Sequence, residues 1–160
     1  MQNSESLKKS IRRWIIFFMI ALVLSGVTAF PLETELAWLN SFFPDSETGL
    51  SLWIQKVYLA LHHTNMEYPF LAYGYDWLAF AHIVIAVAFI GLLKNPVRNK
   101  WIIQFGMIAC VMVLPLAFIA GYVRGIPFYW QLIDCSFGIA GFIPLYICYR
   151  KIIALEKKTQ

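Results

Sequence analysis

Four long runs of apolar residues divide the chain, and each contains at most one charged residue. The runs cover residues 14–30, 77–93, 101–121 and 132–149. An α-helix rises 1.5 Å per residue, so roughly 17 to 25 residues cross a hydrocarbon core about 30 Å thick. None of the runs shows the period-two alternation of polar and apolar residues that marks a barrel strand. The pattern therefore predicts four transmembrane helices.

The segment between the first and second runs, residues 31–75, is too apolar and aromatic for a flexible linker. Apolar side chains recur in it at helical spacing, with a break at residues 44–49. They are Leu32, Leu36, Leu39 and Phe43 before the break, and Leu50, Trp53, Ile54, Val57 and Leu61 after it. We expect two short amphipathic helices that form a cap outside the membrane. They either lie flat in the interface or close over the transmembrane helices.

Composition agrees with this pattern, because 60% of the 160 residues are hydrophobic and only 14% are charged. Soluble domains carry about 25% charged residues. We therefore predict an all-α integral membrane protein: a four-transmembrane-helix bundle with two short extracytoplasmic amphipathic helices between spans one and two. One membrane domain is expected over residues 1–160, with no internal repeat.

The basic residues predict the orientation. Of the 13 lysines and arginines, all except Lys56 and Arg124 lie on one side of the four runs. The positive-inside rule places that side, and with it both chain ends, in the cytoplasm. The small size and the clear charge asymmetry favour a bacterial inner membrane. These charges border the membrane, where they attract anionic lipid headgroups, so we expect no nucleic-acid partner.

The first run has a second interpretation. A basic leader, an apolar run and the small residues Val27-Thr28-Ala29 also form the layout of a secretory signal that is cleaved after residue 29. Cleavage would leave three spans. We favour an uncleaved anchor, because the apolar run is longer than the roughly 7 to 15 residues of a signal-peptide core.

Polar residues inside apolar spans are costly and usually face another helix or a wet cavity. Asp134 lies on a helical face with Gly138, Gly141, Leu145 and Cys148, and glycines let another helix approach closely. The third run carries a matching seam of Gly106, Cys110, Val113, Ala117 and Ala120, which continues to Arg124. We therefore expect the third and fourth helices to pack along these seams, with Arg124 and Asp134 as a structural ion pair.

His82 lies near mid-membrane in the second run, with Ala79 and Ala86 on the same helical face. An interhelical hydrogen bond is the favoured interpretation; proton relay, haem ligation and metal ligation are the alternatives. An outward-opening pocket for a lipid, quinone or small amphiphile is also predicted. Its expected lining is Tyr73, Trp77, His82, Tyr122, Trp130 and Asp134.

No cofactor is predicted. His62, His63 and Glu67 carry donor groups suited to zinc, but adjacent histidines point about 100° apart on a helix. A bis-histidine haem needs a ligand on each of two facing spans, and His82 is the sole histidine in any run. Cys110, Cys135 and Cys148 form no C-x-x-C pair, so we expect them to pack as small apolar residues.

No motif in the chain names a reaction, so three hypotheses remain. The first is an accessory or scaffold subunit that contacts membrane lipids and either a membrane partner or further copies of itself. The second is a component that binds a lipid or small amphiphile. The third, the alternative, is a membrane-embedded enzyme that uses His82 and Asp134 as catalytic groups at an outward-facing site, with or without a metal. Whether the chain is an enzyme is left open.

Overall fold

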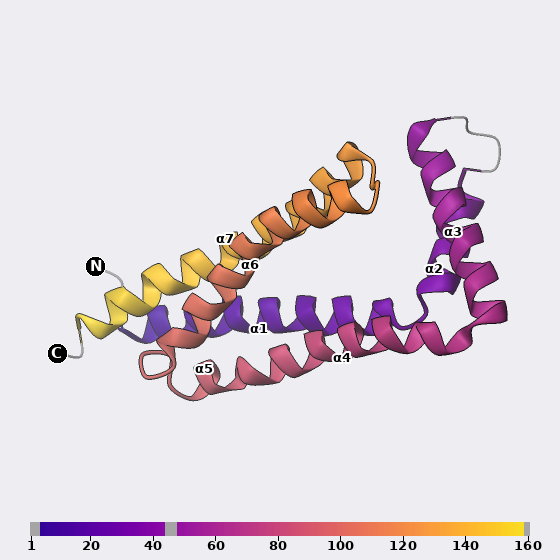
Figure 1. Cartoon of the computed structure of the whole chain (residues 1–160). Coiled ribbons are helices and arrows are strands. Elements are labelled where there is room, and N and C mark those ends of the chain that lie inside the picture. Colours follow the sequence, from indigo (N-terminus) through magenta and orange to yellow (C-terminus); the bar gives the residue numbers. More distant parts are fainter. Residues whose placement is uncertain (1–3, 44–47, 159–160) are drawn as a thin grey trace. The chain divides into compact units, whose positions relative to one another are not determined.

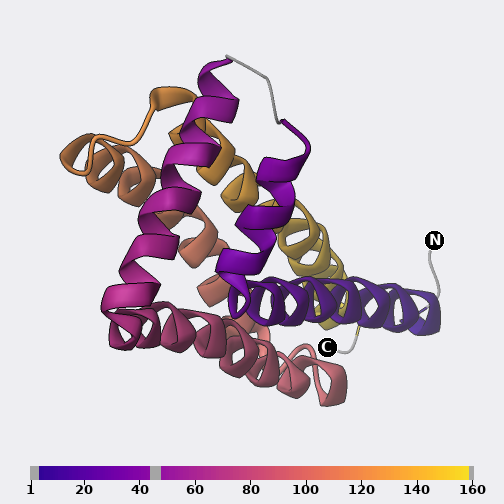
Figure 2. The same cartoon turned by 90° about the vertical axis from the view of Figure 1, so that its right-hand side faces the viewer.

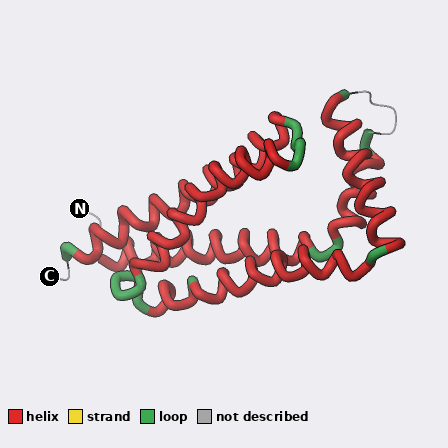
Figure 3. The backbone as a smooth tube through the Cα atoms, in the orientation of Figure 1, coloured by secondary structure: helices red, strands yellow, loops and turns green. Residues whose placement is uncertain are grey.

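The computed structural model of the chain describes residues 4–43 and 48–158. This part of the chain is almost entirely helical and contains no strand (Figure 3). The elements are α1 (Ser4–Ala29), α2 (Leu32–Ser41), α3 (Gly49–Glu67), a 3₁₀ turn η1 (Pro69–Leu71), α4 (Ala72–Ala88), α5 (Ile90–Lys94), α6 (Lys100–Val123) and α7 (Phe128–Glu156).

Four stretches are long and apolar enough to cross a membrane: Ser4–Ala29, Pro69–Lys94, Lys100–Val123 and Phe128–Glu156. The prediction of an all-α protein with four spans is therefore confirmed, and the chain is a multi-pass helical membrane protein. Each span is longer than the apolar run that predicted it, because the helix continues into the basic and aromatic residues at the membrane boundary. The second span contains a break, since α4 ends at Ala88 and α5 begins at Ile90.

The two helices expected between spans one and two are α2 and α3, which we call the cap. They pack beside each other, as both views show (Figures 1 and 2). Thr48 begins α3 as its N-cap, and its side chain accepts a hydrogen bond from the Ser51 backbone N–H. Of the predicted break at residues 44–49, Pro44 to Glu47 lie outside the described residues.

The chain divides into two compact units, one of Met1–Ile20 with Ala86–Gln160 and the other of Ala21–Ile85. Helices α1 and α4 each contribute residues to both units. The single membrane domain expected from the sequence is not tested by this division.

The core of the first unit combines one face of α1 with buried residues of α5, α6 and α7. Leu7, Ile11, Ile15 and Phe18 recur every three or four residues along α1, and all are buried. Cys148 of α7 is also buried, and its thiol donates to the Ile11 carbonyl at 3.8 Å. Phe18 packs against Phe89, with ring centroids 5.0 Å apart. All three cysteines are free thiols, and Cys135 and Cys148 are buried.

Helices α6 and α7 form a hairpin along the two predicted small-residue seams (Figure 1). A Cβ added to Gly138 would lie 2.7 Å from the Cys110 carbonyl oxygen, and one on Gly141 would lie 3.1 Å from the Cys110 sulfur. A Cβ on Gly106 would lie 2.9 Å from a methyl group of Leu145. At Gly138 the neighbour is a backbone atom, whereas at Gly141 and Gly106 it is a side chain, so α6 and α7 pack closely along the predicted face.

In the second unit, the C-terminal part of α1 lies beside α4 (Figures 1 and 2). Gly26 is the point of closest approach, since a Cβ there would meet the Ala79 carbonyl oxygen at 2.6 Å and the His82 Cβ at 3.2 Å. Ala79 is fully buried at this contact. His82 thus lies next to the point where α1 and α4 approach each other most closely.

Candidate functional site

A groove of about 280 Å³ runs along the half of the α6–α7 hairpin that lies next to the connecting turn. Its walls are apolar except for one cation and one anion: Val113, Leu116, Ala117, Ala120, Gly121, Arg124, Ile126 and Asp134. Alanine and glycine leave the hollow open because their side chains are too small to fill it. The groove is therefore an open, apolar hollow with two opposite charges in its lining.

The predicted ion pair between Arg124 and Asp134 is not formed. The ion pairs of the described residues are His62–Glu33, His63–Glu67 and Lys100–Glu156. Arg124 is the C-cap residue of α6 and its side chain is exposed, whereas Asp134 lies almost two turns inside α7. The groove itself occupies the space between these two parts of the hairpin, so each charge faces the hollow without neutralising the other.

The turn that joins α6 to α7 is held by a buried amide side chain, Gln131, which no sequence pattern indicates. Gln131 is 7% exposed, and its Nε2 donates to the Ile126 carbonyl at 2.8 Å. The chain reverses through Gly125, whose φ of 66° favours glycine. Gly121 faces the Gln131 side chain, where a Cβ would come within 2.6 Å of it. The outer end of the groove therefore has a rigid frame.

His82 is partly buried in α4, and its Nδ1 lies 2.9 Å from the Leu78 carbonyl oxygen of the same helix. A carbonyl oxygen only accepts, so Nδ1 is the donor in this hydrogen bond. The partner predicted for His82 was another helix, and the hydrogen bond instead stays within its own. Ala79 and Ala86 on its face are buried, as expected.

The six residues predicted to line one pocket come from both units. Tyr73, Trp77 and His82 belong to α4, and Tyr73 and Trp77 stack edge to face with centroids 5.8 Å apart. Tyr122, Trp130 and Asp134 belong to the hairpin, where Tyr122 is 85% exposed and Asp134 faces the groove. The pocket made of all six, and the enzyme hypothesis that combines His82 with Asp134, stay predictions.

The cap carries a polar network that the sequence analysis did not identify. Glu33 of α2 accepts from two residues of α3: its Oε1 lies 2.6 Å from His62 Nδ1, and its Oε2 accepts from Asn65 Nδ2 at 2.7 Å. The Tyr75 hydroxyl of α4 lies 3.4 Å from Asn65 Nδ2. The hydrogen bonds from Asn65 and then His62 lower the pKa of Glu33 below its ordinary 4.5. The network ties both cap helices to the start of α4.

The candidate zinc ligands do not converge. His62 is bonded to Glu33, whereas His63 pairs with Glu67 one helical turn along, at 3.5 Å. Within the described residues, 4–43 and 48–158, no group of three histidine, cysteine, aspartate or glutamate side chains is placed to hold a metal ion. Adjacent histidines on a helix point in different directions, as the spacing implied.

No protein-family model, no curated protein and no solved structure matches the chain. The groove between α6 and α7 is the feature that combines a hollow, an apolar lining and a predicted site residue.

Proposed function

We propose that this protein is a membrane component that binds a lipid or other small amphiphile in the groove between α6 and α7. The observation that carries the proposal is the pair of opposite, separate charges, Arg124 and Asp134, in an otherwise apolar lining. Asp134 lies inside an apolar run, where a charge is costly and usually pairs with another charge or marks a site for a ligand, and Arg124 lies just beyond the end of the third run. Here they are not paired, so a ligand that brings both complementary charges would satisfy them.

The lining favours an amphiphile whose head carries a phosphate and an ammonium group. Arginine binds phosphate through two parallel N–H donors, and an aspartate accepts hydrogen bonds from an ammonium. The apolar residues from Val113 to Ala120 continue the groove for two helical turns beyond Arg124, a surface that suits an acyl chain. A phosphoethanolamine lipid combines all three features.

Native mass spectrometry of the purified protein tests this proposal. The protein is titrated with a phosphatidylethanolamine, a phosphatidylcholine and a phosphatidylglycerol of the same acyl chains. We expect the phosphatidylethanolamine to bind more tightly than the phosphatidylcholine. Asp134→Asn should weaken phosphatidylethanolamine binding by roughly 10- to 100-fold, the range of a hydrogen bond to a charged group, and Arg124→Gln should weaken the binding of both lipids.

Ser136→Ala is the matched control, because Ser136 lies on α7 outside the groove and donates to the Ile133 carbonyl of its own helix. It should leave the preference unchanged. Equal binding of the three lipids that neither groove variant alters would contradict the proposal, and the accessory or scaffold role would then be favoured.

We also propose that the protein resides in a bacterial inner membrane with both chain ends in the cytoplasm. The support is the charge asymmetry, which places all lysines and arginines except Lys56 and Arg124 on one side of the spans. Cysteine replacements at Lys157 and at Glu67, in a background without the native cysteines, test the orientation. A membrane-impermeant maleimide added to intact cells should label position 67 and spare position 157.

A further inference from the structure

A second candidate site lies at the opposite end of the first unit from the α6–α7 turn. This part, which we call the basic end, consists of the start of α1, helix α5, the loop of residues 95–99 and the end of α7. A groove of about 420 Å³ there is lined by Lys8, Lys94, Arg98 and apolar or amide residues. A neighbouring groove of about 280 Å³ shares Lys8 and Lys94 and adds Lys9 and Arg12. Neither lining contains an acidic residue.

The lysines and arginines at the basic end and at the adjoining start of α6 differ in their partners. Some have partners inside the protein: Lys100 pairs with Glu156 at 2.7 Å, Lys151 donates to the Ser10 hydroxyl, and Arg150 donates to the Tyr146 hydroxyl. Lys8, Lys9, Arg12, Lys94 and Arg98 have no carboxylate partner in the described part of the chain. These five line the grooves, whereas Arg13 and Lys157, which also have no carboxylate partner among the described residues, lie outside both grooves.

The positive-inside rule accounts for the number of charges at this end but not for the presence of five of them along two adjoining grooves. Topology requires only that lysines and arginines flank the spans, whether or not they are paired. Here three elements, α1, α5 and the loop, bring five uncompensated cations to two adjoining hollows. All five side chains are exposed, so solvent screens much of their mutual repulsion, and together they give the grooves a positive potential that attracts an anion.

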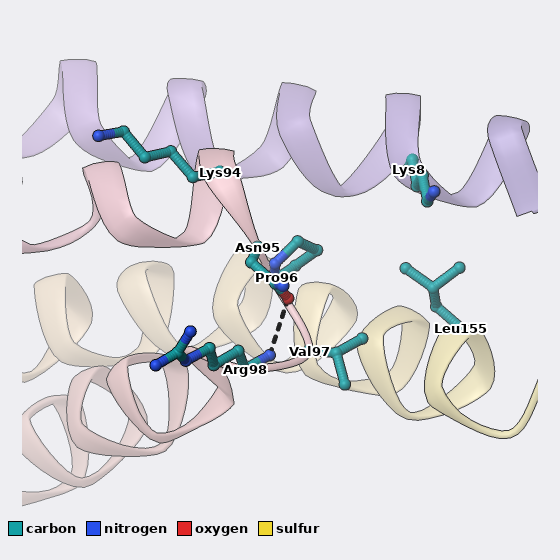
Figure 4. A pocket seen from close by; sticks show the side chains of 7 residues that line it. All are labelled: Lys8, Lys94, Asn95, Pro96, Val97, Arg98 and Leu155. Carbon is teal, nitrogen blue, oxygen red and sulfur yellow. Dashed lines mark hydrogen bonds between the residues drawn. The ribbon is translucent and has the colours of Figure 1, made fainter. Parts of the chain in front are cut away.

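Figure 4 shows how the side chains of the larger groove lie. Lys94 and Arg98 extend to the same side of the loop, and Lys8 lies on the other side with Leu155 of α7. The Arg98 backbone N–H donates to Asn95 Oδ1 at 3.0 Å, and Asn99 Nδ2 donates to the Gly91 and Asn95 carbonyls. These bonds fix the loop, so only flexible side-chain ends must move to enclose an anion.

The floor of the grooves is apolar, with Val97 and Leu155 in one and Ile11 and Leu92 in the other. Cationic side chains around an apolar floor, at the end of membrane-spanning helices, match the boundary between a phosphate headgroup and its acyl chains. We infer that the basic end binds the headgroup phosphate of an anionic phospholipid. This inference is independent of the ligand proposed for the α6–α7 groove.

The test compares two double variants of the full chain that each remove two positive charges. Lys94→Gln with Arg98→Gln changes the groove, whereas Arg13→Gln with Lys157→Gln changes exposed residues outside both linings. Each purified protein is titrated with phosphatidylglycerol and phosphatidylcholine, and binding is followed by native mass spectrometry. The groove variant should weaken phosphatidylglycerol binding by about 30-fold, given the energy of each basic side chain near a phosphate, and leave phosphatidylcholine unchanged.

Three further measurements make the outcome decisive. Lys94→Arg with Arg98→Lys, which keeps both charges, should restore phosphatidylglycerol binding to within about threefold of the wild type. Asp134→Asn should not change it, which separates this site from the proposed outer one. Inorganic phosphate at millimolar concentration should not displace the lipid. Equal losses in the groove variant and the control variant would overturn the inference, and so would displacement by free phosphate.

Discussion

The backbone of Gly26 in α1 lies against the carbonyl oxygen of Ala79 in α4, so closely that a Cβ on residue 26 would be 2.6 Å from that oxygen. Backbone atoms cannot move aside as a side-chain end can. Since the next nearest atoms belong to Ile83 and His82, at 3.0 and 3.2 Å, the contact also positions the histidine. At position 26, therefore, only glycine allows α1 to lie this close to α4.

Gly26→Ala should consequently destabilise the protein by about 1–3 kcal/mol, because the added methyl group forces α1 and α4 apart. Thermal unfolding in detergent measures the effect. Gly74→Ala in α4 is the matched control, since a Cβ there meets nothing within 4 Å, and it should be neutral or stabilising by up to about 1 kcal/mol. Equal effects of the two substitutions would disprove the close approach.

The cap should depend on pH through Glu33. Its pKa is lowered in the folded state by hydrogen bonds from Asn65 and His62, so the carboxylate stabilises the fold above its ordinary pKa of 4.5. This contribution is lost as the pH falls through the lowered folded value. Glu33→Gln should therefore be less stable than the wild type at about pH 6, with the difference vanishing in more acidic solution.

Unfolding temperatures of both proteins across this range provide the measurement. Glu35→Gln is the control, because Glu35 is in the same first turn of α2 and has no side-chain bond to α3 among the described residues. It should not show the pH-dependent difference. A constant gap between Glu33→Gln and the wild type at every pH would contradict the assignment.

Gln131 should hold the α6–α7 turn. Gln131→Leu keeps the bulk against Gly121 but leaves the Ile126 carbonyl without its donor, which should cost about 1–3 kcal/mol. Gln104→Leu makes the same change at an exposed site on α6 and should have little effect. Chemical denaturation in mixed micelles compares the two. If Gln104→Leu lost stability and Gln131→Leu did not, the role given to Gln131 would be contradicted.

The ion pair between Lys100 and Glu156 joins the start of α6 to the end of α7, and both side chains are 28% exposed. A double-mutant cycle with Lys100→Ala and Glu156→Ala should give a coupling free energy of about 0.5–1 kcal/mol, since partial exposure limits such pairs. The coupling should decrease in high salt. Additive single effects would mean that the pair does not stabilise the fold.

Helix α1 should remain in the mature protein. Ile11 and Ile15 are each 1% exposed in the core of the first unit, where Cys148 donates to the Ile11 carbonyl. Cleavage after Ala29 would remove this packing, whereas a signal peptide makes no such contacts. The intact mass of the protein purified from membranes decides between the two, and a product that begins at Phe30 would exclude the anchor.

Some contacts in the structure can be predicted from the sequence pattern, and others cannot. The seam of Gly138, Cys110 and Gly106 was predictable because small residues at helical spacing have a local signature. The Glu33–His62 pair was not, because its members are far apart in the chain and each has the spacing of an ordinary surface residue. Gln131 was missed for a related reason, since nothing in a single amide signals that a turn will bury it.

The sequence by itself determined the class of this protein. Backbone groups in lipid must be bonded within their own segment, so four long apolar runs permit little except four spanning helices. Charge placement along the chain likewise predicts an orientation without reference to packing. Tertiary structure decided which polar groups meet. Arg124 and Asp134 have compatible spacing and charge, yet the small residues between them leave a groove in place of an ion pair. Whether two side chains touch depends on distances of a few ångströms set by packing, and periodicity does not encode such distances.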